Sequence, residues 1–201
     1  MGNIKKSLLI FLTTLFSICL YGQNNIIKKI EEYLAPFKYE EANKEILFVS
    51  IKTQRLYHIR KNKIIQEFTI SSSKYGTGNK KGSYKTPLGL HRIKYKYGED
   101  TPINGIMTGR VFNGKIATIY RDTTRSKTDD VTSRVLWLEG LENGVNKGEN
   151  IDSFKRYIYI HGTSEEGRLG EPASHGCIRM KNKEVIELYK KIKIGTLVLI
   201  L

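Results

Sequence analysis

Residues 157–163 read YIYIHGT and residues 174–180 read SHGCIRM, and these two stretches decide how the chain is interpreted. The first predicts a strand over Tyr157–Ile160 that runs straight into His161. The second places Cys177 after a glycine, 16 residues beyond His161. A cysteine attacks a carbonyl as its thiolate, and a nearby imidazole supplies the thiolate by taking the proton. The pattern therefore favours a nucleophilic Cys–His site formed by a strand end and a Gly-rich loop.

Around these stretches, short apolar runs bounded by polar turns predict a mainly β domain. We expect strands over 46–51, 55–59, 64–70, 88–93, 135–138 and 197–201, with shorter ones at 110–112 and 116–120. Helical spacing follows Asn182, which is a candidate N-cap, so the positive end of that helix could lie near the thiolate. Helices do not alternate with strands, which favours a β-sandwich or mixed sheet with a few short helices. The long polar stretch 96–134 is typical of a lid.

The N-terminal residues predict export. Residues 1–22 combine two lysines, an apolar run of 13 residues and a small residue at Gly22, the parts of a secretory signal peptide. An uncleaved anchor and a lipid-anchored Cys19 are the alternatives. Cleavage would leave Cys177 as the one remaining cysteine, and a lone cysteine in an oxidising compartment is either inert or a working thiol. We expect a periplasmic or cell-envelope location.

The rest of the chain divides into two parts. Residues 23–44 predict an amphipathic helix that ends at Pro36 and either packs on the domain or acts as a spacer. Residues 45–201 form the predicted catalytic domain. The net charge of +14 suits a polyanionic partner, but the charge is spread along the chain and nucleic-acid motifs are absent. We therefore expect no nucleic-acid binding.

Taken together, His161-Gly162 after a strand and the run from Ser174 to Arg179 resemble the L,D-transpeptidase catalytic domain, the YkuD type of cell-wall enzyme. Thr86-Pro87-Leu88-Gly89 matches a second feature of that family, although His91 stands where an aromatic residue is common. The resemblance covers residues 45–201. It implies an L,D-transpeptidase-like mixed-sheet domain that needs neither a metal nor a cofactor.

The resemblance also implies a role for each matching residue. Cys177 would be the nucleophile and His161 the general base, later the acid. The backbone carbonyl of Gly162 would orient His161, in a triad without a carboxylate, and the amide of Gly176 would help to form an oxyanion hole. The side chains assigned to substrate are Arg179, Ser174 and His175. For these three a structural role is the alternative; in particular, Glu165, Glu166 or Glu171 could pair with Arg179.

The implied reaction is acyl transfer on peptidoglycan. Cys177 would be acylated by a tetrapeptide stem, release D-Ala and pass the acyl group to the amine of another stem, giving a 3→3 crosslink in cell-wall biogenesis. Carbapenem-type inhibitors would acylate the same thiol, and a monomer is expected. Two alternatives remain: an L,D-carboxypeptidase or hydrolase that uses the same acyl-enzyme, and a non-catalytic wall-binding protein.

Overall fold

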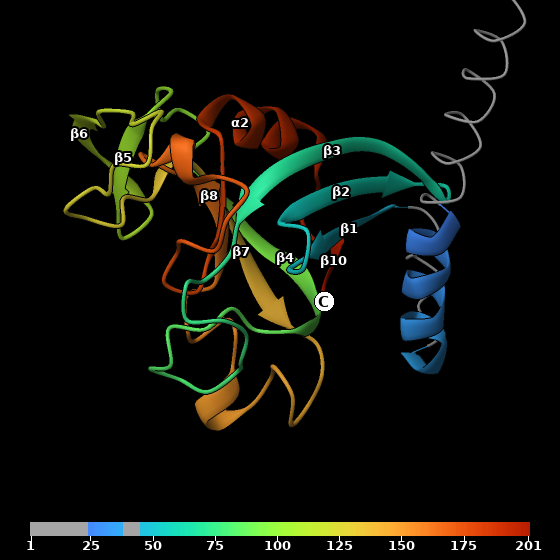
Figure 1. Ribbon diagram of the computed structural model, residues 1–201. Helices are drawn as coiled ribbons and strands as arrows, with labels where there is room; N and C mark the ends of the chain where they lie inside the picture. The colour runs from blue at the N-terminus through green and yellow to red at the C-terminus, as the bar shows by residue number, and fades with distance from the viewer. Residues whose placement is uncertain (1–23, 38–44) are drawn as a thin grey trace, which may run out of the picture.

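The computed structural model describes residues 24–37 and 45–201 (Figure 1). Ten strands form one mixed sheet in the order β4-β10-β1-β2-β3-β9-β8-β7-β5-β6, and a further pairing of β4 with β7 closes it on itself. The strands are β1 (Glu45–Ser50), β2 (Arg55–Arg60), β3 (Lys63–Ser71), β4 (Gly89–Tyr97), β5 (Gly105–Thr108), β6 (Val111–Ile116), β7 (Thr132–Gly140), β8 (Tyr159–Gly162), β9 (Ile178–Met180) and β10 (Leu197–Ile200).

Helices are few. Residues 24–34 are helical and continue into the short 3₁₀ helix η1 (Ala35–Phe37). Two more 3₁₀ turns, η3 (Glu149–Ile151) and η4 (Glu166–Arg168), lie in loops, and α2 (Asn182–Lys191) precedes the last strand. The mainly β, mixed-sheet prediction is confirmed. Pairs β1–β10 and β8–β9 are parallel, and the other strand pairs are antiparallel.

The apolar run of β1 is buried on both of its faces. Leu47 and Val49 join the main core, to which α2 contributes Val185 and Leu188. Side chains alternate along a strand, so Ile46 and Phe48 point the other way. They pack in a second cluster with Ile30 and Leu34 of the N-terminal helix. The helix over residues 24–34 therefore docks on the domain, on the side away from the β5–β6 hairpin (Figure 1).

Two predicted elements begin at other residues than expected. β8 begins at Tyr159 rather than Tyr157, because Tyr157 has a left-handed backbone (φ 58°) that ends a turn. Asn182 is the first residue of α2 and not its cap. Its backbone N–H donates to the carboxylate of Glu166 at 2.8 Å, so that carboxylate satisfies the helix start. The placement of the positive end of α2 near the thiol stays a prediction.

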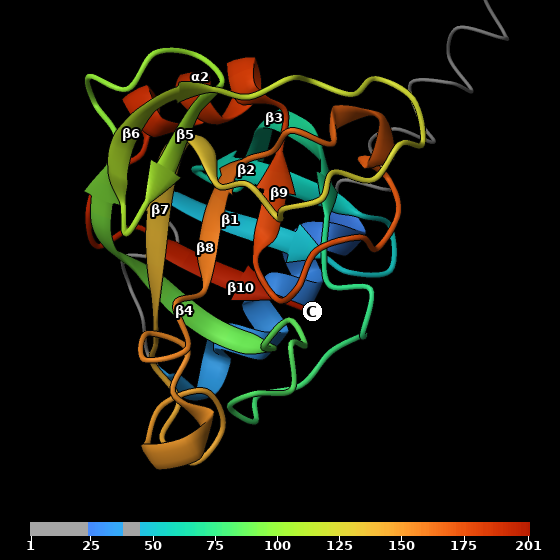
Figure 2. The ribbon, with the colours of Figure 1, turned by 90° about the vertical axis from the view of Figure 1, so that its left-hand side faces the viewer.

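The stretch 96–134 holds the β5–β6 hairpin, of which β5 was not predicted. Figure 2 shows this hairpin standing beside β7 and β8. β5 pairs with β7 at one position, Ile106 with Thr132, and most of β6 is exposed. Residues 117–120 are not a strand, contrary to the prediction for 116–120.

The predicted signal segment, residues 1–22, lies outside the described residues. Within residues 24–37 and 45–201, no helix has the length and apolarity needed to cross a bilayer.

Candidate active site

The parallel pairing of β8 with β9 brings His161, on β8, near Cys177, which directly precedes β9. His161 is paired in register with Arg179, and Arg179 lies two residues after Cys177. The Cys177 thiol lies against the start of β8: its S–H donates to the Tyr157 carbonyl and its sulfur accepts from the Tyr159 N–H, both at 3.4 Å. The segments that carry His161 and Cys177, 16 residues apart in sequence, thus lie side by side at β8 and β9 (Figure 2).

His161 is held in one orientation. The imidazole is 1% exposed, and its Nδ1 lies 2.6 Å from the Gly162 carbonyl oxygen. A carbonyl only accepts, so Nδ1 carries the proton and Nε2 is the free basic nitrogen. This is the contact that the family resemblance implied for Gly162. Burial lowers the pKa of His161, although Asp129 and the Gly162 hydrogen bond act in the opposite direction.

Position 162 has room only for glycine. A Cβ there would lie 2.5 Å from Asn182 Oδ1 and 2.7 Å from the Thr132 carbonyl oxygen. Asn182 is buried, and its Oδ1 accepts from the hydroxyls of Thr132 and Ser133 at 2.6 Å. This small polar cluster fixes the end of β8, and so it fixes the carbonyl that orients His161.

The resting thiol is uncharged. Cys177 is partly exposed, but its pKa is raised to about 12, mainly by burial and also by the nearby Asp129 carboxylate. Arg179 and Arg156 act in the opposite direction. Because the pKa of His161 is lowered at the same time, the pair rests as thiol and neutral imidazole. A thiol in this state could attack a carbonyl only if its proton passed to a base during the attack.

The loop before Cys177 is braced by its own side chains. Ser174 is fully buried; its hydroxyl donates to the Cys177 carbonyl at 2.6 Å and accepts from the Gly176 N–H at 3.2 Å. Gly176 has a φ of 127°, which side-chain-bearing residues rarely adopt. Ser174 thus shapes the loop, the alternative noted for it. The Gly176 amide assigned to the oxyanion hole is engaged by Ser174 in this resting state.

The second sequence motif braces the same loop from outside. Thr86 is fully buried, and its hydroxyl donates to the Gly176 carbonyl at 3.0 Å while accepting from the Ser73 N–H at 2.9 Å. Its backbone continues into β4 through Pro87. The Thr-Pro-x-Gly motif therefore contacts the catalytic loop directly, which the sequence alone did not indicate.

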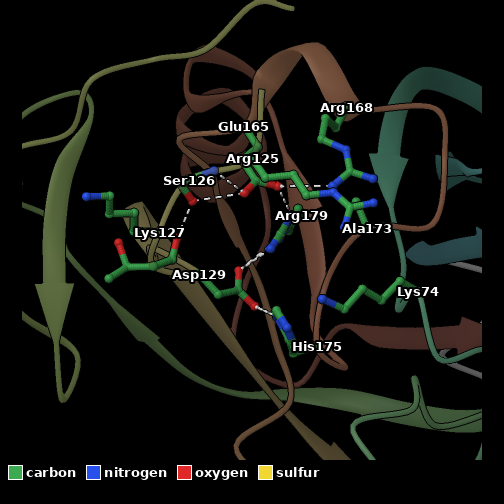
Figure 3. A pocket seen from close by; sticks show the side chains of 11 residues that line it. Lys74, Arg125, Ser126, Lys127, Asp129, Glu165, Arg168, Ala173, His175 and Arg179 are labelled. Carbon is green, nitrogen blue, oxygen red and sulfur yellow. Dashed lines mark hydrogen bonds and ion pairs between the residues drawn. The ribbon is translucent and has the colours of Figure 1, made fainter. Parts of the chain in front are cut away.

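Arg179 is enclosed by acidic side chains (Figure 3). It is 2% exposed, donates from Nη1 to Glu165 at 2.8 Å, and pairs through Nε and Nη2 with Asp129. Of the candidate partners weighed from the sequence, Glu165 is the one that pairs. This placement favours a structural role for Arg179 over the assigned role of binding a substrate carboxylate.

His175 points to the same acidic group. Its Nδ1 lies 2.7 Å from Asp129, and its ring sits 5.8 Å from the ring of Tyr75 and 6.2 Å from that of Tyr84. The side chain is 38% exposed. No hydrogen bond among the described residues joins Cys177 to either histidine. The Nδ1 of His175 is engaged by a carboxylate, whereas the Nδ1 of His161 is held by a backbone carbonyl as the resemblance implied.

Asp129 is a functional candidate that sequence reasoning missed. It lies in the irregular segment before β7, without a motif around it, and it joins Arg179 to His175. Burial raises the pKa of Asp129, but Arg179, His161 and His175 together hold it below the usual range. The site thus has a carboxylate near its Cys–His pair, although the resemblance implied none.

Several cations surround the site. Lys74, Arg125 and Lys127 line a pocket next to Asp129 and His175 (Figure 3). Arg156, also missed from sequence, donates to the carbonyls of Gly78 at 3.2 Å and Lys85 at 2.6 Å. A positive rim of this kind suits an anionic substrate.

Comparison with known proteins identifies a family. A sequence profile of the L,D-transpeptidase catalytic domain (YkuD) matches residues 44–200. Over 116 residues the chain is 29% identical to YbiS of Escherichia coli (strain K12), named a probable L,D-transpeptidase; the match covers 55% of this chain and 35% of YbiS. A stretch of 45 residues is 54% identical to YqjB of Bacillus subtilis (strain 168), which also carries an L,D-transpeptidase name, and covers 22% of this chain and 26% of YqjB. The chain thus matches about a third or less of these relatives' length.

Solved structures with similar folds carry the same name. An L,D-transpeptidase from Xylanimonas cellulosilytica is 19% identical, with a TM-score of 0.49 over 79% of this chain and 60% of that one. The catalytic domain of the Enterococcus faecium enzyme is 17% identical, with a TM-score of 0.47 over 79% of this chain and 98% of that one.

Proposed function

Because the chain belongs to the L,D-transpeptidase (YkuD) family, we propose that it is an exported cysteine acyltransferase that crosslinks peptidoglycan stem peptides. The donor is a tetrapeptide stem, the acyl group passes through Cys177, and the acceptor is an amine. One observation carries the proposal: β8 and β9 bring the Cys177 loop beside an imidazole whose Nε2 is free.

In the first half-reaction, Cys177 Sγ attacks the carbonyl of the third stem residue. The thiol proton passes to Nε2 of His161, which then carries a positive charge. The C–N bond to D-Ala breaks, His161 returns the proton to the departing amine, and a thioester remains. Asp129 favours the imidazolium formed in this step, since its charge raises the pKa of His161.

In the second half-reaction, the acceptor amine attacks the thioester. His161 takes a proton from the amine, the C–S bond breaks, and the thiolate recovers a proton from His161. The new amide is the 3→3 crosslink. The amide bond broken in the donor supplies the free energy, so the exchange needs no nucleotide.

The deciding experiment measures the intact mass of the protein lacking residues 1–22. This form retains Cys177 as its one cysteine. Incubation with a carbapenem should add one inhibitor mass to the unsubstituted protein and none to Cys177→Ala. His161→Ala should slow adduct formation by about 10²- to 10⁴-fold, the usual contribution of a general base, and His175→Ala should slow it far less.

Purified disaccharide-tetrapeptide then tests the reaction class. A 3→3 dimer supports the transpeptidase. A tripeptide alone means that water resolves the thioester, as in the carboxypeptidase alternative. A folded protein that gives neither an adduct nor a product would contradict the proposal and favour the wall-binding alternative.

Export is a separate part of the proposal, supported by the composition of residues 1–22. The protein recovered from the envelope fraction of its own cells should begin at residue 23 when its N-terminus is sequenced. An N-terminus at Met1 would indicate a retained anchor, and lipid on Cys19 a lipoprotein.

A further inference from the structure

The turn of the β5–β6 hairpin places Arg110 over a group of aromatic side chains next to the thiol. Its guanidinium carbon lies 4.6 Å from the ring centroid of Trp137, 5.7 Å from that of Tyr97 and 5.8 Å from that of Tyr157. One of its N–H groups donates to the Tyr159 hydroxyl at 3.2 Å. We refer to these four aromatic residues as the aromatic cluster.

The aromatic cluster is held in place by packing and hydrogen bonding. Trp137 is 7% exposed, its ring stacks on Phe154 at 4.2 Å, and its Nε1–H donates to the Phe154 carbonyl at 3.1 Å. A guanidinium stacks well on such faces, and each contact restricts its motion. The Arg110 head group is therefore held in place before any substrate arrives.

The cluster adjoins the reacting sulfur. Tyr159 and Tyr157 provide the backbone N–H and carbonyl that bond to Cys177 Sγ. Cys177 itself packs against the core that contains Trp137 and Tyr159. A group bound to the Arg110 guanidinium would thus lie close to the acyl group on Cys177.

The charge of Arg110 has no acidic partner among the described residues. Arg179, by contrast, is buried between Asp129 and Glu165. Arg156 donates from both terminal nitrogens to backbone carbonyls and so fastens the loop over residues 78–85. Of the three arginines near the thiol, Arg110 keeps the most N–H groups available to a ligand.

The backbone conformation at Arg110 is also one that residues with side chains rarely adopt. Its φ of 73° lies in the left-handed region, which costs a residue with a side chain about 1 kcal/mol. The preceding Gly109 also has a positive φ, of 57°. Two successive left-handed residues turn the hairpin so that the Arg110 side chain reaches the aromatic cluster.

We propose that Arg110, and not Arg179, receives a substrate carboxylate at the active site. The inference rests on the proposed function, in which both substrates are peptides with free carboxylates. The carboxylate is either that of the donor's terminal D-residue or the one beside the acceptor's amine. A guanidinium lying on the rings offers paired N–H donors that match a carboxylate.

The donor arm of the test compares disaccharide-tetrapeptide with its C-terminal carboxamide. Binding of both is measured by calorimetry to Cys177→Ala protein, so that turnover does not interfere, and kcat/KM is measured with the active enzyme. The acceptor arm compares D-methionine with D-methioninamide as amines that resolve the acyl-enzyme. We expect a preference of about 10- to 100-fold for the free carboxylate in one arm, the usual effect of a charged hydrogen bond.

Arg110→Gln should abolish that preference by weakening the carboxylate ligand, with the carboxamide ligand unaffected. Arg110→Lys, which keeps the charge but loses the paired donors, should retain part of it. Lys115→Gln removes an equal charge from β6 of the same hairpin and should leave the preference intact. The melting temperature of each variant confirms that it is folded.

The inference is overturned if the unsubstituted protein shows no preference in either arm, or if Arg110→Gln keeps it, or if Lys115→Gln loses it equally. Failure of the proposed function would be seen in the mass experiment, as the absence of an inhibitor adduct on Cys177. In that case calorimetry with both donor peptides and with D-methionine and D-methioninamide still reports on Arg110, because it uses Cys177→Ala protein that cannot turn over.

Discussion

Cys177 and His161 rest without charge, and this sets how the site must work. Burial raises the pKa of the thiol to about 12 and lowers the pKa of the imidazole. Such a pair resists casual oxidation, because the thiolate is the reactive form. In the proposed reaction, the thiol would attack only when a carbonyl lies against the sulfur and a base can accept the thiol proton.

The pH dependence of acylation tests the role of Asp129. His161 acts as a base only when neutral, so the acylation rate should be level near neutrality and fall at acidic pH, with the midpoint below the ordinary histidine value. Asp129 raises the pKa of His161. Asp129→Asn should therefore move the acidic fall toward lower pH. Adduct rates with a carbapenem from about pH 5 to about pH 8, the range over which histidines titrate, give the profile.

Asp130→Asn is the matched control, because the neighbouring carboxylate contacts Thr128 and not the Arg179–His175 pair. Its profile should match that of the unsubstituted protein. A shift of the Asp129→Asn profile toward higher pH, or no shift, would show that Asp129 does not act on His161.

At the scale of elements, the site depends on the junction of β8 with the start of α2. Gly162, Thr132 and Asn182 meet there with no spare room. The junction ties the carbonyl that orients His161 to a helix whose first N–H is capped by Glu166. A substitution at this junction should therefore lower both the free energy of unfolding and the acylation rate.

Gly162→Ala tests this junction. Its Cβ would press on Asn182 and the Thr132 carbonyl, so we expect a loss of about 1–3 kcal/mol in the free energy of unfolding, the usual cost of overpacking, together with slower acylation. Urea denaturation and adduct rates measure the two effects. Gly144→Ala, where nothing lies within 4 Å but φ is 75°, should cost about 1 kcal/mol and leave acylation unchanged. Normal acylation by a fully stable Gly162→Ala would contradict this view of the junction.

Much of the sheet could be predicted because its strands are short apolar runs between polar turns. β9 was missed since three residues, Ile178–Met180, carry too little pattern. β5 was missed because Gly105 and Thr108 look like the loop around them. Both strands form because they pair with other strands in the folded sheet. A local sequence pattern does not show these pairings.

The residues of the candidate site also divide into those that the sequence could predict and those that it could not. Cys177, His161 and Gly162 stand in a compact motif, so the sequence could place them together. Asp129, Arg110 and Arg156 come from three separate loops or turns and carry no motif. Their proximity to the thiol is a product of tertiary structure. The ion pair of Arg179 could not be predicted either, because its partner Asp129 lies 50 residues away in sequence.

At the scale of the whole molecule, the N-terminal helix belongs to the folded domain. Ile30 and Leu34 are buried against β1, β4 and β10. Tyr33 also donates to Glu142 at 3.0 Å, and burial followed by this contact raises the pKa of Tyr33 to about 12. This helix therefore stabilises the side of the sheet opposite the hairpin.

Leu34→Ala should lower the free energy of unfolding by about 2 kcal/mol, the low end for a buried leucine, and it should leave acylation unchanged at temperatures well below melting. Thermal unfolding of the protein lacking residues 1–22 provides the measurement. Lys28→Ala, on the exposed face of the same helix, should change stability by less than about 0.5 kcal/mol. Equal stabilities for Leu34→Ala and Lys28→Ala would mean that the helix is only a spacer.

The order of strands also governs when this chain acquires its structure during synthesis. β10 sits between β4 and β1, which are made long before it, and it pairs with both. Until β10 leaves the ribosome, each of those strands has an unpaired edge and the closed sheet lacks a member. The closed sheet therefore forms only after β10 is available to pair with both strands. Closure of the sheet thus depends on contacts between segments that are far apart in sequence, which slows folding.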